Sequence, residues 1–251
     1  MSSLIAVHSF RGGTGKSNSC ANIATILAQE GRRVAVVDAD IQSPGVHVIF
    51  GVDAAGAVHS LNDYLWGRCA IADAAQDVTP ALNGTATGKI FLIPSSIDPN
   101  QIARVIRDGY DVGLLTEGFR ALISDLSLDA LIIDTHPGLN EETLLSIAMA
   151  DVLAIILRPD QQDYEGTSVT VRVARKLGVP RMRLIVNKTP AVFDRDHVRA
   201  EVETAYDCEV AAVLPHSDEM MALSSRDIFS LRYPDHPIST LYRTVAHSLV
   251  E

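Results

Sequence analysis

A glycine-rich segment near the start of the chain carries the residue types best suited to chemistry. It reads, in order, Gly12, Gly13, Thr14, Gly15, Lys16, Ser17 and Asn18. Glycines let a backbone curl so that its N–H groups point at phosphate oxygens, and a helix that begins there adds partial positive charge. The lysine of such a segment neutralises nucleotide phosphates, and its serine hydroxyl is a ligand for Mg²⁺. The alternative is a turn that caps an ordinary helix, but the Gly-Lys-Ser ending favours phosphate binding.

Three aspartates follow apolar runs that read as strands. Asp38 and Asp40 come just after the run 33–37, and Asp134 comes just after the run 128–133. A carboxylate at a strand end can hold Mg²⁺, either directly or through water. Aspartates at strand ends also cap turns. These three are expected at the same edge of the sheet as the glycine-rich segment, which favours a metal site.

The elements that must position these residues alternate between short apolar strands and amphipathic helices. Strands are expected at 4–7, 33–37, 90–93, 128–133, 152–157, 184–186 and 210–214, and helices at 17–29, 101–107, 112–124, 141–150, 166–177, 195–205 and 238–250. Apolar strands between helices indicate an α/β fold with a doubly wound, mostly parallel sheet and helices on both faces. Its ligands bind at the carboxyl ends of the strands.

No linker or repeat divides the chain, so residues 1–251 are expected to form one domain. The segment 53–89 is rich in Ala, Asp, Gly and Thr, and we interpret it as an insertion or a mobile segment inside that domain. The N-terminus lacks the features of a signal peptide, and no apolar run approaches the roughly 18 residues that span a bilayer. A cytoplasmic location is therefore expected.

Charge and cysteine content limit the classes of function. The net charge of -10 opposes binding to nucleic acid or anionic lipid. The segment 172–199 nevertheless holds eight basic residues against two acidic ones, so a local basic face is possible. The three cysteines, Cys20, Cys69 and Cys208, are too far apart in sequence to suggest a metal clip and are expected to be small buried residues.

The glycine-rich segment departs from the usual phosphate loop. Phe10 occupies the position of the first glycine of that motif, and Arg11 precedes a glycine pair. This pattern resembles the deviant phosphate loop of the MinD/ParA family. Residues 19–40 are similar to that family's first helix, second strand and first switch, 131–138 to its Walker B strand and second switch, and 214–218 to its late Pro-x-x-Asp nucleotide loop. The resemblance spans nearly the whole chain and implies the ParA-like branch.

The resemblance implies roles for individual residues. Lys16 would act on the phosphates, and Asp40 would position the attacking water. Ser17, Asp134 and, less directly, Asp38 would hold Mg²⁺. The family has lysine at the position of Arg11, and that lysine reaches across an ATP-bound dimer to the partner's phosphates. Arginine keeps the charge and adds a planar fork of donors, so we expect Arg11 to act in trans; a surface arginine is the alternative.

The base is expected to be adenine. Residues 187–190 read Asn-Lys-Thr-Pro, so the aspartate of the guanine-reading Asn-Lys-x-Asp motif is absent. The resemblance places Asn187 on the adenine with Pro215 and Asp218 nearby, although Asn187 also fits a turn. His136 stands where the family commonly has proline. It is either a sensor of the γ-phosphate or a tolerated loop residue, and we favour the second.

The resemblance implies a slow, partner-stimulated ATPase that uses ATP and Mg²⁺ and dimerises with ATP. It would position or partition a cargo, such as DNA, a protein complex or an organelle. It would bind nonspecific DNA through the 172–199 segment, and it would therefore associate with the nucleoid. Arg172, Arg175 and Lys176 share one helical face there, which is as easily a solvated surface.

Other functions remain open. One alternative is a regulatory module whose nucleotide state controls a partner protein without DNA transport. Another is a metabolic or iron–sulfur relative, against which the unpaired cysteines argue. The C-terminal helix 238–250 has one apolar stripe and Arg243 as its fixed positive charge, so we expect it to pack on the core, with no direct membrane anchor.

Overall fold

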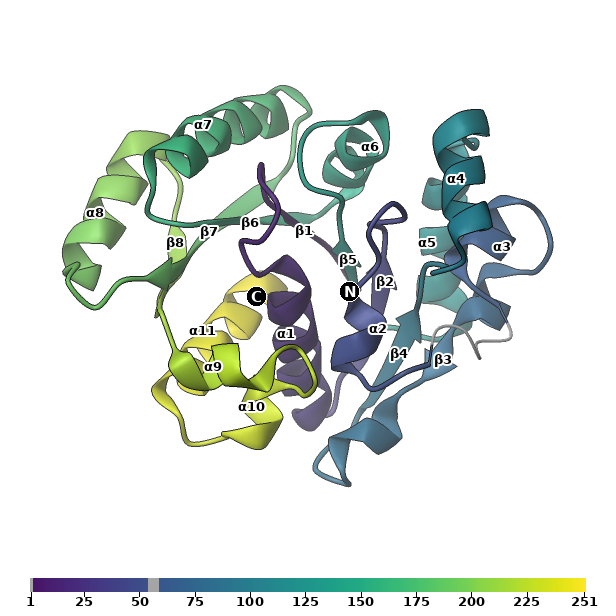
Figure 1. Cartoon of the computed structure of the whole chain (residues 1–251), viewed down its shortest axis with the longest axis horizontal. Helices are drawn as coiled ribbons and strands as arrows, with labels where there is room; N and C mark the ends of the chain where they lie inside the picture. Colours follow the sequence, from purple (N-terminus) through teal and green to yellow (C-terminus); the bar gives the residue numbers. More distant parts are fainter. Residues whose placement is uncertain (1, 54–58) are drawn as a thin grey trace.

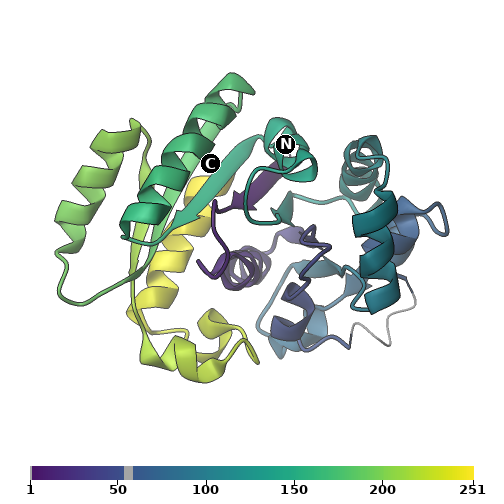
Figure 2. The same cartoon turned by 45° about the horizontal axis from the view of Figure 1, so that its top comes forward.

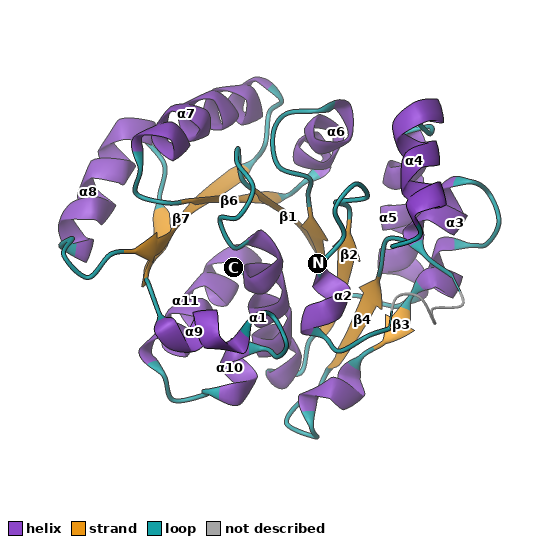
Figure 3. Ribbon diagram, viewed as in Figure 1, coloured by secondary structure: helices purple, strands orange, loops and turns teal. Residues whose placement is uncertain are grey.

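A computed structural model describes residues 2–53 and 59–251 of the chain. Their strands form one eight-stranded sheet in the order β3-β4-β2-β5-β1-β6-β7-β8 (Figures 1 and 3). All pairs are parallel except β3 with β4, which are antiparallel at one edge. The strands are β1 (Ser3–His8), β2 (Arg33–Asp38), β3 (Gln76–Asp77), β4 (Lys89–Ile93), β5 (Ala130–Asp134), β6 (Val152–Leu157), β7 (Arg181–Thr189) and β8 (Val210–Pro215).

Helices cover both faces of this sheet. One face carries α1 (Lys16–Gln29), α2 (Val46–Ile49), η2 (Thr79–Leu82), α9 (Asp218–Leu223), α10 (Phe229–Arg232) and α11 (Pro237–Val250). The other carries α3 (Leu61–Leu65), η1 (Ile71–Ala74), α4 (Pro99–Asp108), α5 (Gly113–Asp125), α6 (Glu141–Met149), α7 (Gln161–Lys176) and α8 (Arg195–Tyr206). The predicted doubly wound α/β fold is confirmed.

The central strand β1 shows how one short sequence serves both layers. Successive side chains of a strand point to opposite faces. Leu4 and Ala6 accordingly pack in the core under α5, α6 and α7, whereas Ile5 and Val7 pack under α1 and α11. Because both faces are covered, an unbroken apolar run is needed, and this is the pattern from which the strand was predicted.

The C-terminal helix α11 packs on the core, as predicted. It lies alongside α1 (Figures 1 and 2) and buries Tyr242, Val245 and Leu249. The Tyr242 hydroxyl hydrogen-bonds the Ser19 hydroxyl of α1 at 3.2 Å. No helix among the described residues is long and apolar enough to cross a membrane.

The segment 53–89 builds the β4 edge of the sheet. Residues 54–58 lie outside the described residues. The remainder contains α3, η1, β3 and η2, and Leu61 and Leu82 are fully buried. The sequence did not predict β3, because two residues that pair at an edge leave no periodic pattern.

The start of α7 differs from its prediction in a way that matters for the site. The helix begins at Gln161 rather than at Gly166. Its N-cap is Asp160, whose carboxylate accepts a hydrogen bond from the backbone N–H of Asp163 at 3.0 Å. The added turn brings two carboxylates close to Arg11 of the phosphate loop.

Candidate nucleotide-binding site

The glycine-rich segment forms a loop between the end of β1 and the start of α1. Gly13 and Gly15 have positive φ angles of 77° and 103°, a region that favours glycine. A Cβ atom on Gly15 would lie 2.5 Å from Nδ2 of Asn187, so only glycine fits there without a shift. The loop ends where α1 begins, at Lys16, which gives it the anion-binding geometry expected from the sequence.

Two side chains at the end of β7 hold this loop in place. The Asn187 amide donates to the Thr14 carbonyl and the Lys188 ammonium to the Gly13 carbonyl, both at 2.8 Å. The Asn187 side-chain oxygen accepts from the backbone N–H of Lys188 at 2.8 Å. The structure therefore shows Asn187 bracing the phosphate loop, and its predicted contact with adenine stays a prediction.

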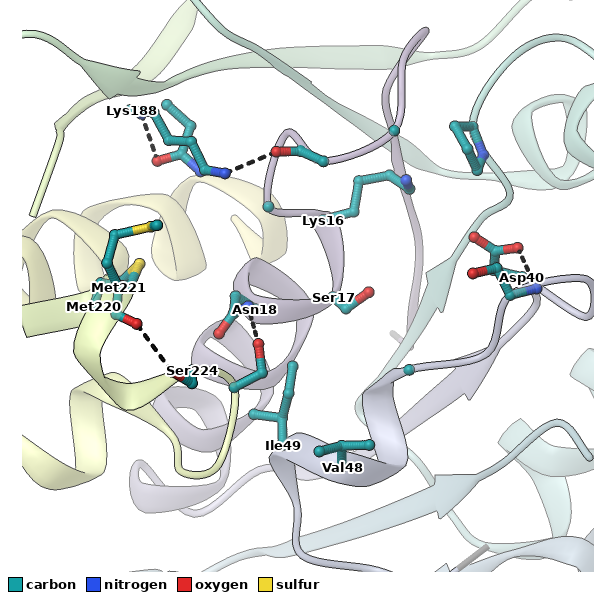
Figure 4. Close-up of a pocket in the computed structure, with 18 of the residues that line it drawn as sticks. Lys16, Ser17, Asn18, Asp40, Val48, Ile49, Lys188, Met220, Met221 and Ser224 are labelled. Carbon is teal, nitrogen blue, oxygen red and sulfur yellow. Dashed lines mark hydrogen bonds between the residues drawn. The ribbon is translucent and has the colours of Figure 1, made fainter. Parts of the chain in front are cut away.

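A cavity of about 740 Å³ opens beside the loop at the carboxyl ends of the strands (Figure 4). It brings together the predicted Gly12, Gly13, Gly15, Lys16, Ser17, Asn18, Asp40 and Asn187. Figure 4 shows Lys16 and Ser17 between Asp40 on one side and Met220 and Met221 on the other. The volume and the mixture of charged loop and apolar wall suit a nucleotide.

Sequence reasoning missed the far wall of this cavity. The additional lining residues are Ser43, Gly45, Val48, Ile49, Pro137, Lys188, Met220, Met221, Ser224 and Ser225, with His136 close to Asp40. Of the residues predicted there, Pro215 ends β8, and Asp218 begins α9 with an exposed side chain beside a smaller hollow. The next turn of α9, at Met220 and Met221, contributes to the cavity instead. The sequence carries no signal for this wall; in the structure, the apolar side chain of Met221 is 59% exposed there.

The predicted metal ligands Asp38 and Asp134 are buried next to the site and are not among the residues that line the cavity, whereas Ser17 is. Asp38 and Asp134 are paired across β2 and β5 and are buried. The Ser17 hydroxyl donates to Oδ2 of Asp134 at 2.6 Å. Asp38 accepts hydrogen bonds from the backbone N–H groups of Gly45 at 2.9 Å and Val46 at 3.2 Å. These bonds fix both carboxylates beside the phosphate loop.

Burial makes the ionised form of these carboxylates costly. It raises the pKa of Asp134 to about 6, against the opposing effects of Lys16 and Ser17. Burial and the neighbouring Asp134 raise the pKa of Asp38 well above its ordinary value. Oδ1 of Asp134 has no N–H or O–H partner among the described residues, although the Cys20 thiol also faces this carboxyl. An orphan carboxylate oxygen beside a serine hydroxyl is a donor set that fits Mg²⁺.

Asp40 approaches the cavity from the loop after β2. Its Oδ1 accepts a hydrogen bond from the backbone N–H of Ser43 at 3.2 Å and lies 3.9 Å from Nε2 of His136. Partial burial raises the pKa of Asp40, and the nearby His136 and Lys16 oppose that rise. Asp40 and His136 thus lie near each other on the cavity wall, and the predicted role of Asp40 in positioning water stays a prediction.

Comparison with known proteins decides the family. A sequence model of the family described as "ParA: NUBPL iron-transfer P-loop NTPase" matches residues 1–250. The chain belongs to the ParA family of P-loop NTPases. An ATP-binding protein of Methanocaldococcus jannaschii whose function is uncharacterised is 30% identical to this ParA-family chain, over all of the chain and 88% of that protein. The antiactivator FleN of Pseudomonas aeruginosa is 24% identical, over 98% of the chain and 85% of FleN.

The solved structure of the septum site-determining protein MinD from Pyrococcus horikoshii, complexed with Mg-ADP, shares the ParA-family fold. It matches with a TM-score of 0.80 and 21% identity, over 99% of this chain and 96% of that one. That likeness confirms the fold predicted from the MinD/ParA resemblance. The ligand in that structure agrees with the cofactors predicted here, ATP and Mg²⁺.

Two residues that depart from the usual phosphate loop contact α7 in this ParA-family protein. Phe10 packs so closely on Gly166 that a Cβ there would lie 2.2 Å from the phenyl ring. The Arg11 guanidinium lies 3.5 Å from Oδ1 of Asp163 and 3.6 Å from Oδ1 of Asp160. Asp163 is itself buried and accepts two hydrogen bonds from Arg158 near 3 Å. Arg11 therefore pairs with its own chain, outside the residues that line the cavity.

Fewer cations of the basic segment 172–199 are free to bind DNA than its charge suggests. Arg175 donates to the carbonyls of Tyr206 and Asp207 at the end of α8. Other cations pair with carboxylates: Arg183 with Glu209 at 3.2 Å and Arg199 with Glu203 at 3.6 Å. Arg172, Lys176 and Arg195 remain exposed. The free basic surface is therefore smaller than expected from the sequence.

Proposed function

We propose that the chain is a Mg²⁺-dependent ATPase that works as a nucleotide-state switch, and that residues 1–251 act as one ATPase domain. The hydrogen bond from the Ser17 hydroxyl to the buried Asp134, next to a cavity that Lys16 and Ser17 line, is the main support. It places the proposed metal ligands next to the proposed phosphate site. The family of P-loop NTPases to which the chain belongs makes a nucleoside triphosphate the natural ligand.

Each residue of the proposed site has a distinct task. The N–H groups of the phosphate loop and the Lys16 ammonium bind the β- and γ-phosphates, where they offset negative charge. Ser17 and Asp134, supported by Asp38, hold Mg²⁺, which supplies charge neutralisation at the phosphate oxygens. Asp40 orients a water molecule for in-line attack on the γ-phosphate. The buried carboxylates have raised pKa values, and a bound cation relieves the cost of their charge.

Adenine is the proposed base. Thr189 and Pro190 follow Asn187-Lys188, so this loop offers no carboxylate for the guanine amino group. Met220 and Met221 give the cavity an apolar wall on which a purine can stack. Hydrogen bonds from Asn187 would add to that contact, since one hydrogen of its amide is committed to the Thr14 carbonyl and the other is not.

Arg11 is the proposed trans-acting group of an ATP-dependent homodimer. In the single chain it pairs with Asp160 and Asp163 at the start of α7, and its side chain is 40% exposed. The partly exposed pair with Asp160 contributes only about 0–1 kcal/mol, and the buried Asp163 is already paired with Arg158. A partner's phosphates therefore compete readily for this arginine. Hydrolysis in the free protein would be slow, and a partner protein that stabilises the dimer would accelerate it.

We consider two kinds of switch, which differ in what the nucleotide state controls. A positioning ATPase would hold nonspecific DNA through Arg172, Lys176 and Arg195. A regulator would control a partner protein by its nucleotide state, which the similarity to the antiactivator FleN favours. The iron–sulfur alternative is favoured by the description of the family model, but the cysteines argue against it: Cys20 is buried in α1, and the other two cysteines belong to segments at opposite edges of the sheet.

Retention on nonspecific DNA separates these two kinds of switch. The charge-reversal pair Arg172→Glu and Lys176→Glu leaves the structural contacts of Arg175 intact. We expect a positioning ATPase to be retained on DNA at low salt only with ATP, and the double variant to lose that retention. Retention that is absent with ATP, or that survives the reversal, counts against a DNA-bound switch and favours the regulator.

Equilibrium binding and turnover test the ATPase itself. We expect Mg-ATP binding that EDTA weakens, with slow phosphate release. Lys16→Ala should weaken ATP binding at least about ten-fold, or about 1.4 kcal/mol. Lys89→Ala removes a surface lysine that pairs with Asp77 at the far edge of the sheet and serves as the matched control. Equal affinity of the Lys16 variant and the control, or no phosphate release from the wild type, would overturn the proposal.

A further inference from the structure

Two side chains from different loops face one point in the cavity. Asp40 follows β2 and His136 follows β5, and both line the cavity beside Lys16 and Ser17 (Figure 4 shows Asp40 there). Nε2 of His136 lies 3.9 Å from Oδ1 of Asp40. That distance is too long for a hydrogen bond, which joins heavy atoms at about 2.7–3.2 Å. The two side chains therefore do not hydrogen-bond each other, although both face the cavity.

The contacts of His136 determine which of its nitrogens accepts. Nδ1 lies 2.6 Å from the Pro137 carbonyl oxygen. A carbonyl only accepts, so Nδ1 carries a hydrogen, and in the ring form with one hydrogen Nε2 presents a lone pair. Asp40 is also an acceptor, and Ser43 N–H occupies only part of the capacity of its Oδ1. Two acceptors therefore converge on one point, and neither can satisfy the other.

The loop that carries His136 is fixed by its own hydrogen bonds. The Thr143 hydroxyl of α6 donates to the His136 carbonyl at 3.1 Å. The backbone N–H of Thr135 donates to Val7 of β1, and that of Gly138 donates to Ser9 of the phosphate loop, both at 3.2 Å. The imidazole is thus placed by the same strands and loop that position the phosphates, which is the preorganisation that a reacting group needs.

We propose that His136 and Asp40 together hold the water that attacks the γ-phosphate. This inference rests on the proposed ATPase function. A water on the cavity side of the pair, about 2.8 Å from each acceptor, would donate one hydrogen to each of two atoms that lie 3.9 Å apart. Its lone pairs then point away from both side chains and are free for attack. His136 is a positioning residue, which replaces the interpretation of it as a tolerated loop residue.

The step balances without a change in the protonation of His136. The water oxygen forms a bond to the γ-phosphorus while the bond to the bridging oxygen of ADP breaks, and the electron pair leaves with ADP. One hydrogen of the water stays on the phosphate product and the other passes to solvent. Orientation alone is the contribution of His136, so its loss should act on turnover rather than on nucleotide affinity.

Variants at position 136 distinguish a side chain that acts as a hydrogen-bond acceptor from one that acts through positive charge. We expect His136→Ala to lower kcat for ATP about a hundred-fold, with KM and the Kd for a fluorescent ATP analogue within about two-fold. His136→Gln supplies an oxygen acceptor and should recover part of the loss, whereas His136→Lys supplies only charge and should not. His247→Ala, at a surface histidine that pairs with Glu30, is the matched control and should leave kcat unchanged.

Coupling to Asp40 gives a second readout. If both residues hold one water, Asp40→Ala and the double variant with His136→Ala should lose turnover equally, instead of multiplying their losses. Multiplicative losses, a rescue by lysine but not by glutamine, or unchanged kcat in folded His136→Ala would each overturn the inference. A wild type that binds ATP and hydrolyses none would instead overturn the proposed function.

Discussion

Replacing Asp134 by asparagine should stabilise the nucleotide-free protein while it disables the metal site. Asp134 is 1% exposed, and burial raises its pKa from 3.8 to about 6. At about 1.4 kcal/mol per pKa unit, the ionised carboxyl destabilises the folded state by about 3 kcal/mol. Asparagine keeps an oxygen to accept the Ser17 hydroxyl and removes the charge that faces Asp38.

The sign of the pH dependence follows from the raised pKa. Below pH about 4 the Asp134 carboxyl is protonated in both the folded and the unfolded state, so it does not lower the free energy of unfolding. Between pH 4 and pH 6 the unfolded state ionises first, and the folded state loses stability as the pH rises. Above pH 6 the full cost of about 3 kcal/mol applies. The advantage of Asp134→Asn over the wild type should therefore be largest at pH 7.5 and should vanish towards pH 4.

Urea unfolding in EDTA, followed by circular dichroism from pH 4 to pH 8, measures this advantage. The difference between the variant and the wild type cancels groups that do not interact with Asp134, and it includes the relief of Asp38, whose pKa the Asp134 charge raises. Asp125→Asn, at an exposed position of α5, is the control and should change stability by less than about 0.5 kcal/mol. Mg-ATP should stabilise the wild type more than Asp134→Asn. A variant that is no more stable at pH 7.5, or whose advantage persists at pH 4, refutes the reasoning.

Three further substitutions test other parts of the structure. Gly15→Ala places a Cβ 2.5 Å from Asn187 Nδ2 at a position with a positive φ angle. ATP binding measured by calorimetry should therefore be lost, and the free energy of unfolding should fall by more than about 1 kcal/mol. Wild-type affinity in this variant would show that the loop adapts. Arg11→Ala should keep nucleotide affinity and lose most phosphate release, and unchanged turnover would exclude the trans role. Tyr242→Phe leaves the buried Ser19 hydroxyl without its hydrogen-bond partner and should lower the free energy of unfolding by about 1–2 kcal/mol. Unchanged stability would mean that Ser19 finds another hydrogen-bond partner.

The sequence predicts the half of the site that belongs to the phosphate loop and to the strand ends. The run Gly12–Ser17 and the aspartates 38, 40 and 134 carry local signals, because each follows an unbroken apolar strand. Parallel strands deliver their carboxyl ends to one edge, so a correct fold already brings these residues together. The register of β2 on β5 pairs Asp38 with Asp134 in this way.

The other half depends on short elements without periodicity. Helix α2 has four residues and α9 has six, which is too few to show a repeating apolar face. The residues of α2 that line the cavity are placed by packing of that helix against α1. The contact between Arg11 and Asp163 was also missed, because α7 was predicted to begin at Gly166; the N-cap signal of Asp160 was present in the sequence.

The molar mass of Asp40→Ala in solution tests the nucleotide switch most directly. Light scattering after size exclusion is recorded with Mg-ATP and with Mg-ADP at the same protein concentration. Loss of the group that orients the water should trap the ATP-bound state, so we expect a dimer of the 27.0 kDa chain with ATP and a monomer with ADP. A monomer in both nucleotides, with ATP shown to be bound, would contradict the proposal that ATP drives self-association.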